Sequence, residues 1–351
     1  MRQTAPQGRA RRAGLALCAA GLALSCATAW AQESAAPAAP RVDLSRFDLG
    51  LQARALGDGV YVVEGANADF SIANGCNIIN TGFIVTGGGV LVINTGVSRR
   101  QGEQLRALIE RTTAEPVVQV LNLNLHPDYF LGNQAFADVP RRATALTRAG
   151  MAREAAAYET NLYRLCGDWM AGTESLLPDG DLDPLLDAGT GRGEFGIAGR
   201  NFVLQAYSGH TDSDLVLIDR RSGVAFAGGL VFVDRVPTTP HARLDAWQRS
   251  LDRLETLAGH EGVRTLVPSH GPVRSGAAVL TGIGQTRAYL QWLEAQFGAW
   301  ARQGWEMTEV LRAPVPAPYG GWAAFETEYV RNVVHLYPHY ERAVLEAPRP
   351  R

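Results

Sequence analysis

The sequence predicts a mixed α/β protein whose elements fit a four-layer αββα sandwich followed by a C-terminal helical extension. Short apolar runs typical of strands occur in two groups, at 51–94 and 202–233. Apolar residues at helical spacing follow each group, at 99–113 and 244–257. Strands and helices repeated in two similar halves fit two stacked sheets with helices on their outer faces. Periodicity alone supports only the mixed α/β class.

The first half contains short strands joined by turn residues, then a helix and a buried strand. Gly87-Gly88-Gly89 predicts a turn between the last two of the early strands. Apolar residues on one face predict a helix over 99–113, and the apolar run 116–123 predicts the buried strand. The early strands are expected at 51–55, 60–64, 77–85 and 90–94.

The second half opens with a long helix, expected over 147–174, and a polar connection through Asp187. The segment Gly191–Gly196 matches the spacing of a nucleotide-binding loop but is interpreted as a turn, because no strand-to-helix unit surrounds it. The aromatic-rich C-terminal region is expected to be helical. The predicted strands are 202–208, 214–219, 224–227, 230–233 and 263–267, and the later helices are 244–257, 277–300 and 321–346.

The N-terminus has the features of an export signal. A basic segment precedes a small-residue apolar core, and Ala29-Trp30-Ala31 offers a cleavage site. Residues 1–31 are therefore predicted to be a signal peptide, with either general or twin-arginine export open. The Ala/Pro-rich segment 32–50 is predicted to be a linker. Residues 51–275 are predicted to form the main α/β domain, and residues 276–351 a helical C-terminal extension. We expect a periplasmic protein with no membrane span after cleavage.

The charge balance argues against nucleic acid as a partner. The whole chain has a formal net charge of −2. Because four arginines and no acidic residue lie in 1–31, removal of that segment leaves a net charge of about −6. A mature chain of this charge offers no basic stripe to displace counterions from phosphates.

Two cysteines, Cys76 and Cys166, remain after the predicted leader is removed. In an oxidising compartment, two leftover cysteines often pair. A disulfide between them is the favoured interpretation, and two separately buried thiols are the alternative.

Polar side chains capable of binding a metal follow the buried strand. Asn124, His126, Asp128 and Tyr129 lie where an extended chain directs side chains into one pocket. His210 and His270 follow two later predicted strands, in Ser208-Gly-His-Thr-Asp-Ser-Asp214 and Pro268-Ser-His-Gly-Pro272. Three histidines at three strand ends, together with a carboxylate, indicate retained chemistry better than coincidence.

These segments resemble the metallo-β-lactamase superfamily, whose signature over 124–129 is His-x-His-x-Asp-His. The resemblance implies one half-site of three ligands, corresponding to Asn124, His126 and His210. The other half-site corresponds to Asp128, Tyr129 and His270. Each half-site has exchanged one imidazole. Gly229 stands at the position of the family's bridging Asp, and Asn94 stands at the position of an Asp that orients a ligand.

The sequence also resembles one subgroup, the quinoprotein relay system zinc metallohydrolases. These proteins are exported, are related to a sulfur-oxidation-associated branch of the superfamily and are linked with PQQ-dependent quinoproteins. The residues that carry this resemblance are Asn74–Ile78, Asn80–Phe83, His126–Asp128, Asn161–Trp169 and Val236–His241.

The expected cofactor is zinc, about one ion per chain, with iron as the alternative. His126, Asp128, His210 and His270 are the predicted ligands, and Asp128, Tyr129 and His241 the predicted catalytic residues. Asn94, Asn124, Thr211 and Asp214 are expected to orient the ligands.

Three outcomes are left open for this site. The four predicted ligands gather one metal ion, or Tyr129 or His241 completes a modified site, or the metal is lost and the pocket only binds. Tyr129 has the alternative of a packed aromatic, and His241 that of a surface loop histidine. His335 and His339, with Pro338 between them, are interpreted as structural.

The resulting function hypothesis is a periplasmic metal-dependent hydrolase of an ester, thioester or amide, acting on a small molecule and linked to a PQQ quinoprotein. The alternative, from another class, is a non-catalytic partner that binds a metal or a quinoprotein. A third is an iron-dependent thiol dioxygenase.

Overall fold

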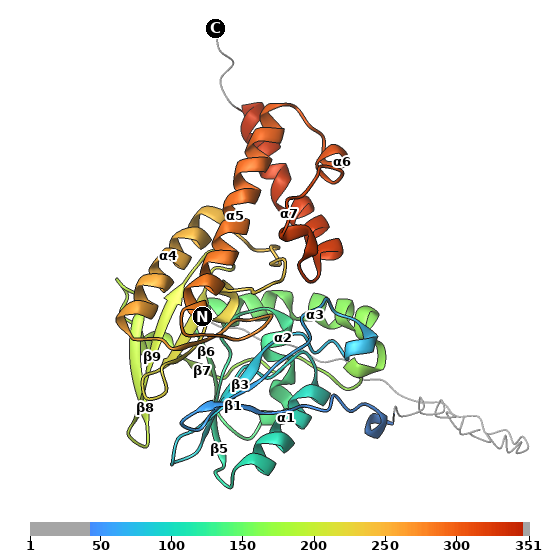
Figure 1. Ribbon diagram of the computed structural model, residues 1–351. Coiled ribbons are helices and arrows are strands. Elements are labelled where there is room, and N and C mark those ends of the chain that lie inside the picture. The colour runs from blue at the N-terminus through green and yellow to red at the C-terminus, as the bar shows by residue number, and fades with distance from the viewer. Residues whose placement is uncertain (1–42, 347–351) are drawn as a thin grey trace, which may run out of the picture. The chain divides into compact units, whose positions relative to one another are not determined.

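The computed structural model describes residues 43–346, so the predicted signal peptide and most of the predicted linker lie outside the described residues. The described part contains two sheets with helices on their outer faces (Figure 1). None of the described helices is long and apolar enough to cross a membrane.

The first sheet has seven strands in sequence order, β1 to β7. Strands β1 to β4 pair antiparallel, and β4 to β7 pair parallel. The parallel step from β4 to β5 is made through helix α1 (Arg99–Thr112), which Ser98 caps by accepting a hydrogen bond from the Gln101 backbone N–H. The strands are β1 (Arg54–Gly57), β2 (Val60–Val63), β3 (Thr81–Val85), β4 (Val90–Ile93), β5 (Val117–Leu121), β6 (Arg141–Ala143) and β7 (Gly180–Asp181).

The second sheet has six strands in the order β13-β12-β11-β10-β9-β8. Its one parallel pairing joins β11 to β12, across the connection that contains helix α4. The strands are β8 (Arg192–Ile197), β9 (Arg200–Tyr207), β10 (Asp214–Asp219), β11 (Val224–Phe226), β12 (Thr265–Val267) and β13 (Arg274–Ser275).

Seven α-helices complete the described part. They are α1 (Arg99–Thr112), α2 (Pro127–Phe130), α3 (Ala145–Cys166), α4 (Leu244–His260), α5 (Ala278–Arg302), α6 (Met307–Val310) and α7 (Phe325–Glu346).

Three apolar clusters define the layers. One lies between the two sheets and includes Ile84 from β3 and Leu217 from β10. A second joins the outer face of the first sheet to α1, through residues such as Val92 and Leu105. A third joins the second sheet to α4, α5 and α7. The predicted αββα order is therefore confirmed, because each sheet buries one face on the other sheet and one on helices.

Two local predictions are wrong. The segment Gly191–Gly196 was expected to turn, but most of it forms the edge strand β8, which pairs with β9 over six residues. The apolar run 230–233 was expected to be a strand. It instead contains the end of a short 3-10 helix, Gly228–Leu230, and one isolated bridge from Phe232 to His270.

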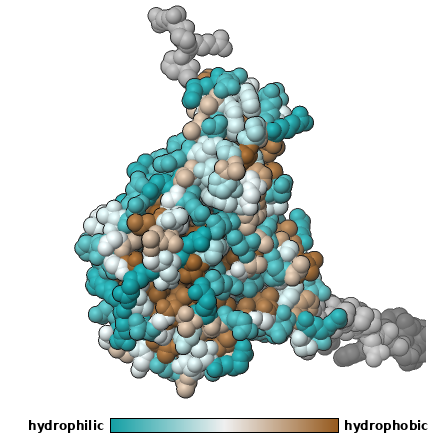
Figure 2. Space-filling view, viewed as in Figure 1, coloured by the Kyte–Doolittle hydropathy of each residue, from teal (hydrophilic) through white to brown (hydrophobic). Residues whose placement is uncertain are grey.

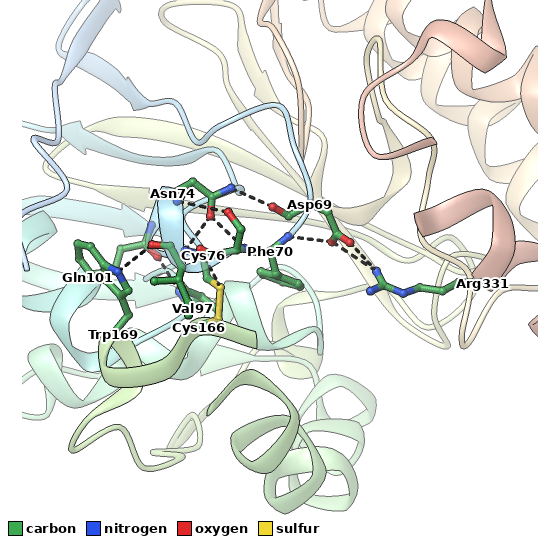
Figure 3. Close-up of a disulfide and its surroundings, with 11 residues drawn as sticks. Asp69, Phe70, Asn74, Cys76, Val97, Gln101, Cys166, Trp169 and Arg331 are labelled. Carbon is green, nitrogen blue, oxygen red and sulfur yellow. Dashed lines mark hydrogen bonds and ion pairs between the residues drawn. A yellow bond between two sulfur atoms is a disulfide. The ribbon is translucent and has the colours of Figure 1, made fainter. Parts of the chain in front are cut away.

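A disulfide joins Cys76 to Cys166, as the sequence analysis favoured. Figure 3 shows its surroundings: Cys76 follows a loop in which Asn74 is bonded to Ser71 and Asp69, and Cys166 ends α3. The bond therefore fixes the loop before β3 to the end of α3.

We predict that loss of this disulfide lowers the free energy of unfolding. The bond closes a separation of 90 residues, which in a chain-entropy description is worth about 4 kcal/mol. Denaturant titration of Cys76→Ser/Cys166→Ser should show a loss of about this size. Reductant should destabilise the parent protein and leave the double variant unchanged. Equal stability of the two proteins would contradict the prediction.

Candidate active site

The loop after β5 places two of the predicted site residues. His126 precedes the single-turn helix α2, whose first residue is Pro127. Leu123 is held by its backbone N–H, which donates to Asn94 Oδ1 at 3.0 Å. Asn94 was expected to orient a metal ligand. The structure shows that it fixes the backbone of the loop that carries Asn124 and His126.

His210 is oriented by a buried hydrogen-bond network. Its Nδ1 lies 3.2 Å from Asp214 Oδ1, and Asp214 also accepts from the Thr211 backbone N–H at 2.9 Å. Asn124 Nδ2 donates to the same Asp214 oxygen at 2.5 Å, while Asn124 Oδ1 accepts from the His126 backbone N–H at 2.9 Å. Because the carboxylate only accepts, His210 carries its proton on Nδ1 and leaves Nε2 with a free lone pair.

Asn124 therefore does not replace the lost histidine as a ligand. Both ends of its carboxamide are engaged, one by Asp214 and one by the His126 backbone. Its observed role is to join the two histidine-bearing loops, in keeping with the expected orienting role.

His270 is oriented from the opposite side. Its Nδ1 donates to the Ile78 carbonyl at 2.9 Å, because a carbonyl can only accept. Asn80 Nδ2 donates to the carbonyls of Pro268 and Gly271 at 3.0 and 2.8 Å, which pins the loop on both sides of His270. The free Nε2 of His270 lies 3.4 Å from Asp128 Oδ2.

The four predicted ligands thus form two pairs. His126 and His210 lie with ring centroids 4.6 Å apart and nearly perpendicular. Asp128 and His270 form the second pair. The ring of Phe232 contacts both His210, at 5.5 Å, and His270, at 5.1 Å between centroids. Within 43–346, no three His, Cys, Asp or Glu side chains are arranged to hold one ion.

Gly229, at the position of the family's bridging aspartate, leaves no room for a bridging side chain. A Cβ atom added there would overlap Nδ1 of His210 and lie 2.8 Å from Asn124 Nδ2. The His210 ring and the Asn124 carboxamide therefore occupy the space that a longer side chain would need. A bridging carboxylate cannot be accommodated without displacing His210.

The two pairs differ in electrostatic state. Burial, and then the nearby His210, His241 and His270, hold the pKa of His126 well below its usual value. Burial also lowers the pKa of His270 and raises that of Asp128 to about 7. Because His270 Nε2 is an acceptor, a protonated Asp128 can donate to it. This pair can hold or release one proton near neutral pH.

The Nε2 atoms of His126 and His210 are among the buried side-chain nitrogens that have no hydrogen-bond partner in the described residues. Both residues are almost fully buried. A buried imidazole nitrogen without a partner is costly unless a ligand satisfies it. This pair is therefore the part of the site that fits a metal ion.

His241 lies beside this pair. Its ring centroid is 5.5 Å from that of His126, and its Nε2 is 3.5 Å from the Tyr158 hydroxyl. It is partly buried, and burial lowers its pKa. The structure thus places His241 next to the predicted ligands rather than on a remote surface loop.

Tyr129 lies elsewhere. It is almost fully buried in the apolar cluster between the two sheets, and burial raises its pKa. Its hydroxyl has no hydrogen-bond partner among the described residues. This placement corresponds to the packed-aromatic alternative.

A cavity of about 400 Å³ opens beside the site. His126, Asp128 and His270 line it, together with residues that sequence reasoning missed. In Figure 2, apolar residues gather in the middle of the sandwich, below the C-terminal helices. The missed cavity residues with polar side chains are Tyr158, Asn161, Arg235, Thr238, Glu328, Arg331 and His335. His335 was interpreted as structural, and the structure places it in the cavity wall, because α7 continues through Pro338.

The sequence over 74–270 matches the profile of the metallo-beta-lactamase superfamily. The chain belongs to this superfamily. Among curated proteins, no significant sequence match was found.

Solved structures of metallo-beta-lactamases share the fold. That from Pontibacter korlensis is 21% identical with a TM-score of 0.53, covering 69% of this chain and 99% of its own. Those from Erythrobacter litoralis and Hirschia baltica are 18% and 17% identical, with TM-scores of 0.53 and 0.52. They cover 69% and 68% of this chain, and 96% and 97% of their own. At these identities the likeness shows the fold alone.

We predict that Gly229→Ala destabilises the protein by about 1–3 kcal/mol, because the added methyl overlaps the His210 ring. Gly284 on α5, where an added Cβ has no atom within 4 Å, provides the control. Gly284→Ala should be neutral or stabilising by up to about 1 kcal/mol. Denaturant unfolding measures both. If Gly229→Ala is as stable as the parent, the space beside His210 is not filled as described.

We also predict that Asp128 makes the metal-free protein less stable as pH rises. Its usual pKa of 3.8 becomes about 7 in the fold, so between these values the folded state binds a proton that the unfolded chain has released. The stability contributed by this group therefore falls from about pH 4 to 7 and is level above, by an amount on the order of 4 kcal/mol.

Asp128→Asn isolates this effect from the buried histidines, whose lowered pKa values act in the opposite direction. Chelator-treated parent and variant are unfolded across pH 4–8. The variant should gain stability relative to the parent as pH rises. A constant difference across this range would show that the pKa of Asp128 is not raised.

Proposed function

We propose that the protein is a metal-dependent hydrolase that uses one ion, held by His126 and His210. The observation that carries the proposal is the pair of unpartnered, buried Nε2 atoms, with the two rings 4.6 Å apart. The His210–Asp214 hydrogen bond supports it, since a carboxylate behind a metal-binding imidazole fixes its tautomer.

The residues present do not fit the family's two-ion centre. The half-site of Asp128 and His270 lacks its third ligand, because Tyr129 stands at that position and lies in the core. At Gly229 there is no space for the side chain of a bridging aspartate. A catalytic zinc site takes three protein ligands and keeps one position open. His241, next to His126, is the candidate for the third donor.

The remaining polar groups have roles that follow from their positions. When bound, a zinc ion supplies a water of lowered pKa and polarises the bond under attack. Asp128 and His270 line the cavity with Oδ2 and Nε2 3.4 Å apart, which suits them to hold or deliver a proton at a leaving group. The Phe232 ring contacts both His270 of this pair and His210. The reaction class supported is hydrolysis of an ester, thioester or amide.

The cellular setting is part of the same proposal. The leader-like segment 1–31 supports export to the periplasm, and the disulfide is in keeping with an oxidising compartment. The motifs shared with quinoprotein relay system zinc metallohydrolases support a link to a PQQ-dependent quinoprotein.

Metal analysis of protein exported to a bacterial periplasm tests the proposal. We expect about one zinc per chain, lost in His126→Ala/His210→Ala. His260→Ala is the control, because that histidine is exposed and remote from the cavity. The double variant should also lose hydrolysis of chromogenic esters and thioesters.

Two results would redirect the proposal. Iron together with thiol-dependent oxygen uptake would favour the dioxygenase. No metal above background, with stability unaffected by chelator, would favour a binding protein, the alternative supported by the absence of a three-ligand group in 43–346.

A further inference from the structure

The C-terminal helix α7 forms one wall of the active-site cavity. Glu328, Arg331 and His335 line the cavity at spacings of three and four residues, so they share one face of the helix. The family match ends at residue 270. These three side chains therefore lie outside the segment that matches the superfamily.

This wall is held in place by hydrogen bonds at several points. The backbone N–H groups of Ala323 and Val236 donate to the carbonyls of Asp234 and Ala323, at 3.0 and 3.1 Å. Thr239 Oγ1 donates to Asn332 Oδ1 at 2.7 Å, and Asn332 donates to the Tyr289 hydroxyl at 2.9 Å. The face of α7 that lines the cavity is thus fixed before any ligand binds.

Two arginines and two carboxylates neutralise one another at this wall. Arg331 Nη1 bonds to Glu328 Oε1 at 2.8 Å and lies 3.3 Å from an Asp69 oxygen, an ion pair drawn in Figure 3. Arg235 Nη2 lies 3.8 Å from Glu328 Oε1 and its Nη1 donates to the Ala68 carbonyl. The cluster has no surplus positive charge to attract an anion.

One acceptor in the cluster has no donor. Glu328 is only 2% exposed, and its Oε2 has no hydrogen-bond partner in the described chain. Leaving a buried carboxylate oxygen unpaired is costly, and a donor from a bound molecule would satisfy it.

The rest of the cavity offers apolar contacts. Leu162 and Leu165 come from α3, and Phe70 and Ile78 from the two ends of the segment that contains Cys76. A cavity of about 400 Å³ suits a small molecule with an apolar body.

We propose that Glu328 recognises the hydrogen-bond-donating head group of an amphipathic substrate, a primary ammonium or a hydroxyl, whose apolar body lies against α3. The inference that this ligand is a substrate depends on the hydrolase function proposed above. The inference that it binds depends only on the cavity.

The test uses full-length protein treated with chelator, so it does not depend on whether a metal is held. Three probes with the same phenylbutyl body are titrated by calorimetry: 4-phenylbutylamine, 4-phenylbutan-1-ol and 4-phenylbutanoate. We expect the amine, the alcohol or both to bind at least about tenfold more tightly than the carboxylate. Which of the two binds better identifies an ammonium or a hydroxyl as the preferred head group.

Glu328→Gln should reduce binding of the preferred probe by about tenfold. Glu326→Gln, exposed on the same helix, should leave it unchanged. The proposal is overturned if the carboxylate binds as well as both donor probes, or if a folded Glu328→Gln protein keeps the parent's preference. Should that variant not fold, the probe comparison in the parent protein decides.

Discussion

The hydrogen bonds around Asp214 are the constraint on which the site depends. This buried carboxylate binds the His210 imidazole, the Thr211 backbone and the Asn124 carboxamide at once. Asn124 in turn holds the His126 backbone. Loops from the two sheets are thereby locked together. The orientation of the His210 imidazole and the position of the His126 backbone follow from this one acidic group.

The same network explains how ligand positions of the superfamily site can be exchanged while the loops that carry them stay fixed. With Asn at 124 and Gly at 229, the imidazole of His210 and the carboxamide fill the space of a bridging carboxylate. The exchanges at these two positions are therefore coupled. They leave two imidazoles whose Nε2 atoms have no partner among the described residues and, against the same Phe232 ring, a carboxyl–imidazole pair 3.4 Å apart. In the function proposed above, the two imidazoles hold one ion and the carboxyl–imidazole pair handles a proton.

The sequence was sufficient for the fold because its strand groups and motif segments fall in superfamily order. It also placed His126, His210, Asp128 and His270 at strand ends, where the structure finds them. It could not show that His126 contacts His210 and that Asp128 contacts His270, since these contacts depend on how the loops from the two sheets pack together. Nor could it place Tyr129, because an aromatic next to a ligand motif suits a core as well as a site.

Sequence reasoning failed furthest in the C-terminal region. Glu328, Arg331 and His335 share a helical face, but their spacing is equally typical of a solvated face. Only the packing of α7 against the loop at 234–239 brings that face to the cavity. The edge strand β8 was not predicted because its glycines are typical of a turn. Its pairing with β9, a long-range contact, is what makes this segment a strand.

In the proposed function, His126 and His210 hold one ion that Asp128 and His270 do not bind. Anomalous scattering from a zinc-soaked crystal, collected on both sides of the zinc absorption edge, locates the ion directly. We expect a single peak within bonding distance of Nε2 of His126 and of His210. A peak bound between Asp128 and His270, or two peaks of equal height, would contradict it.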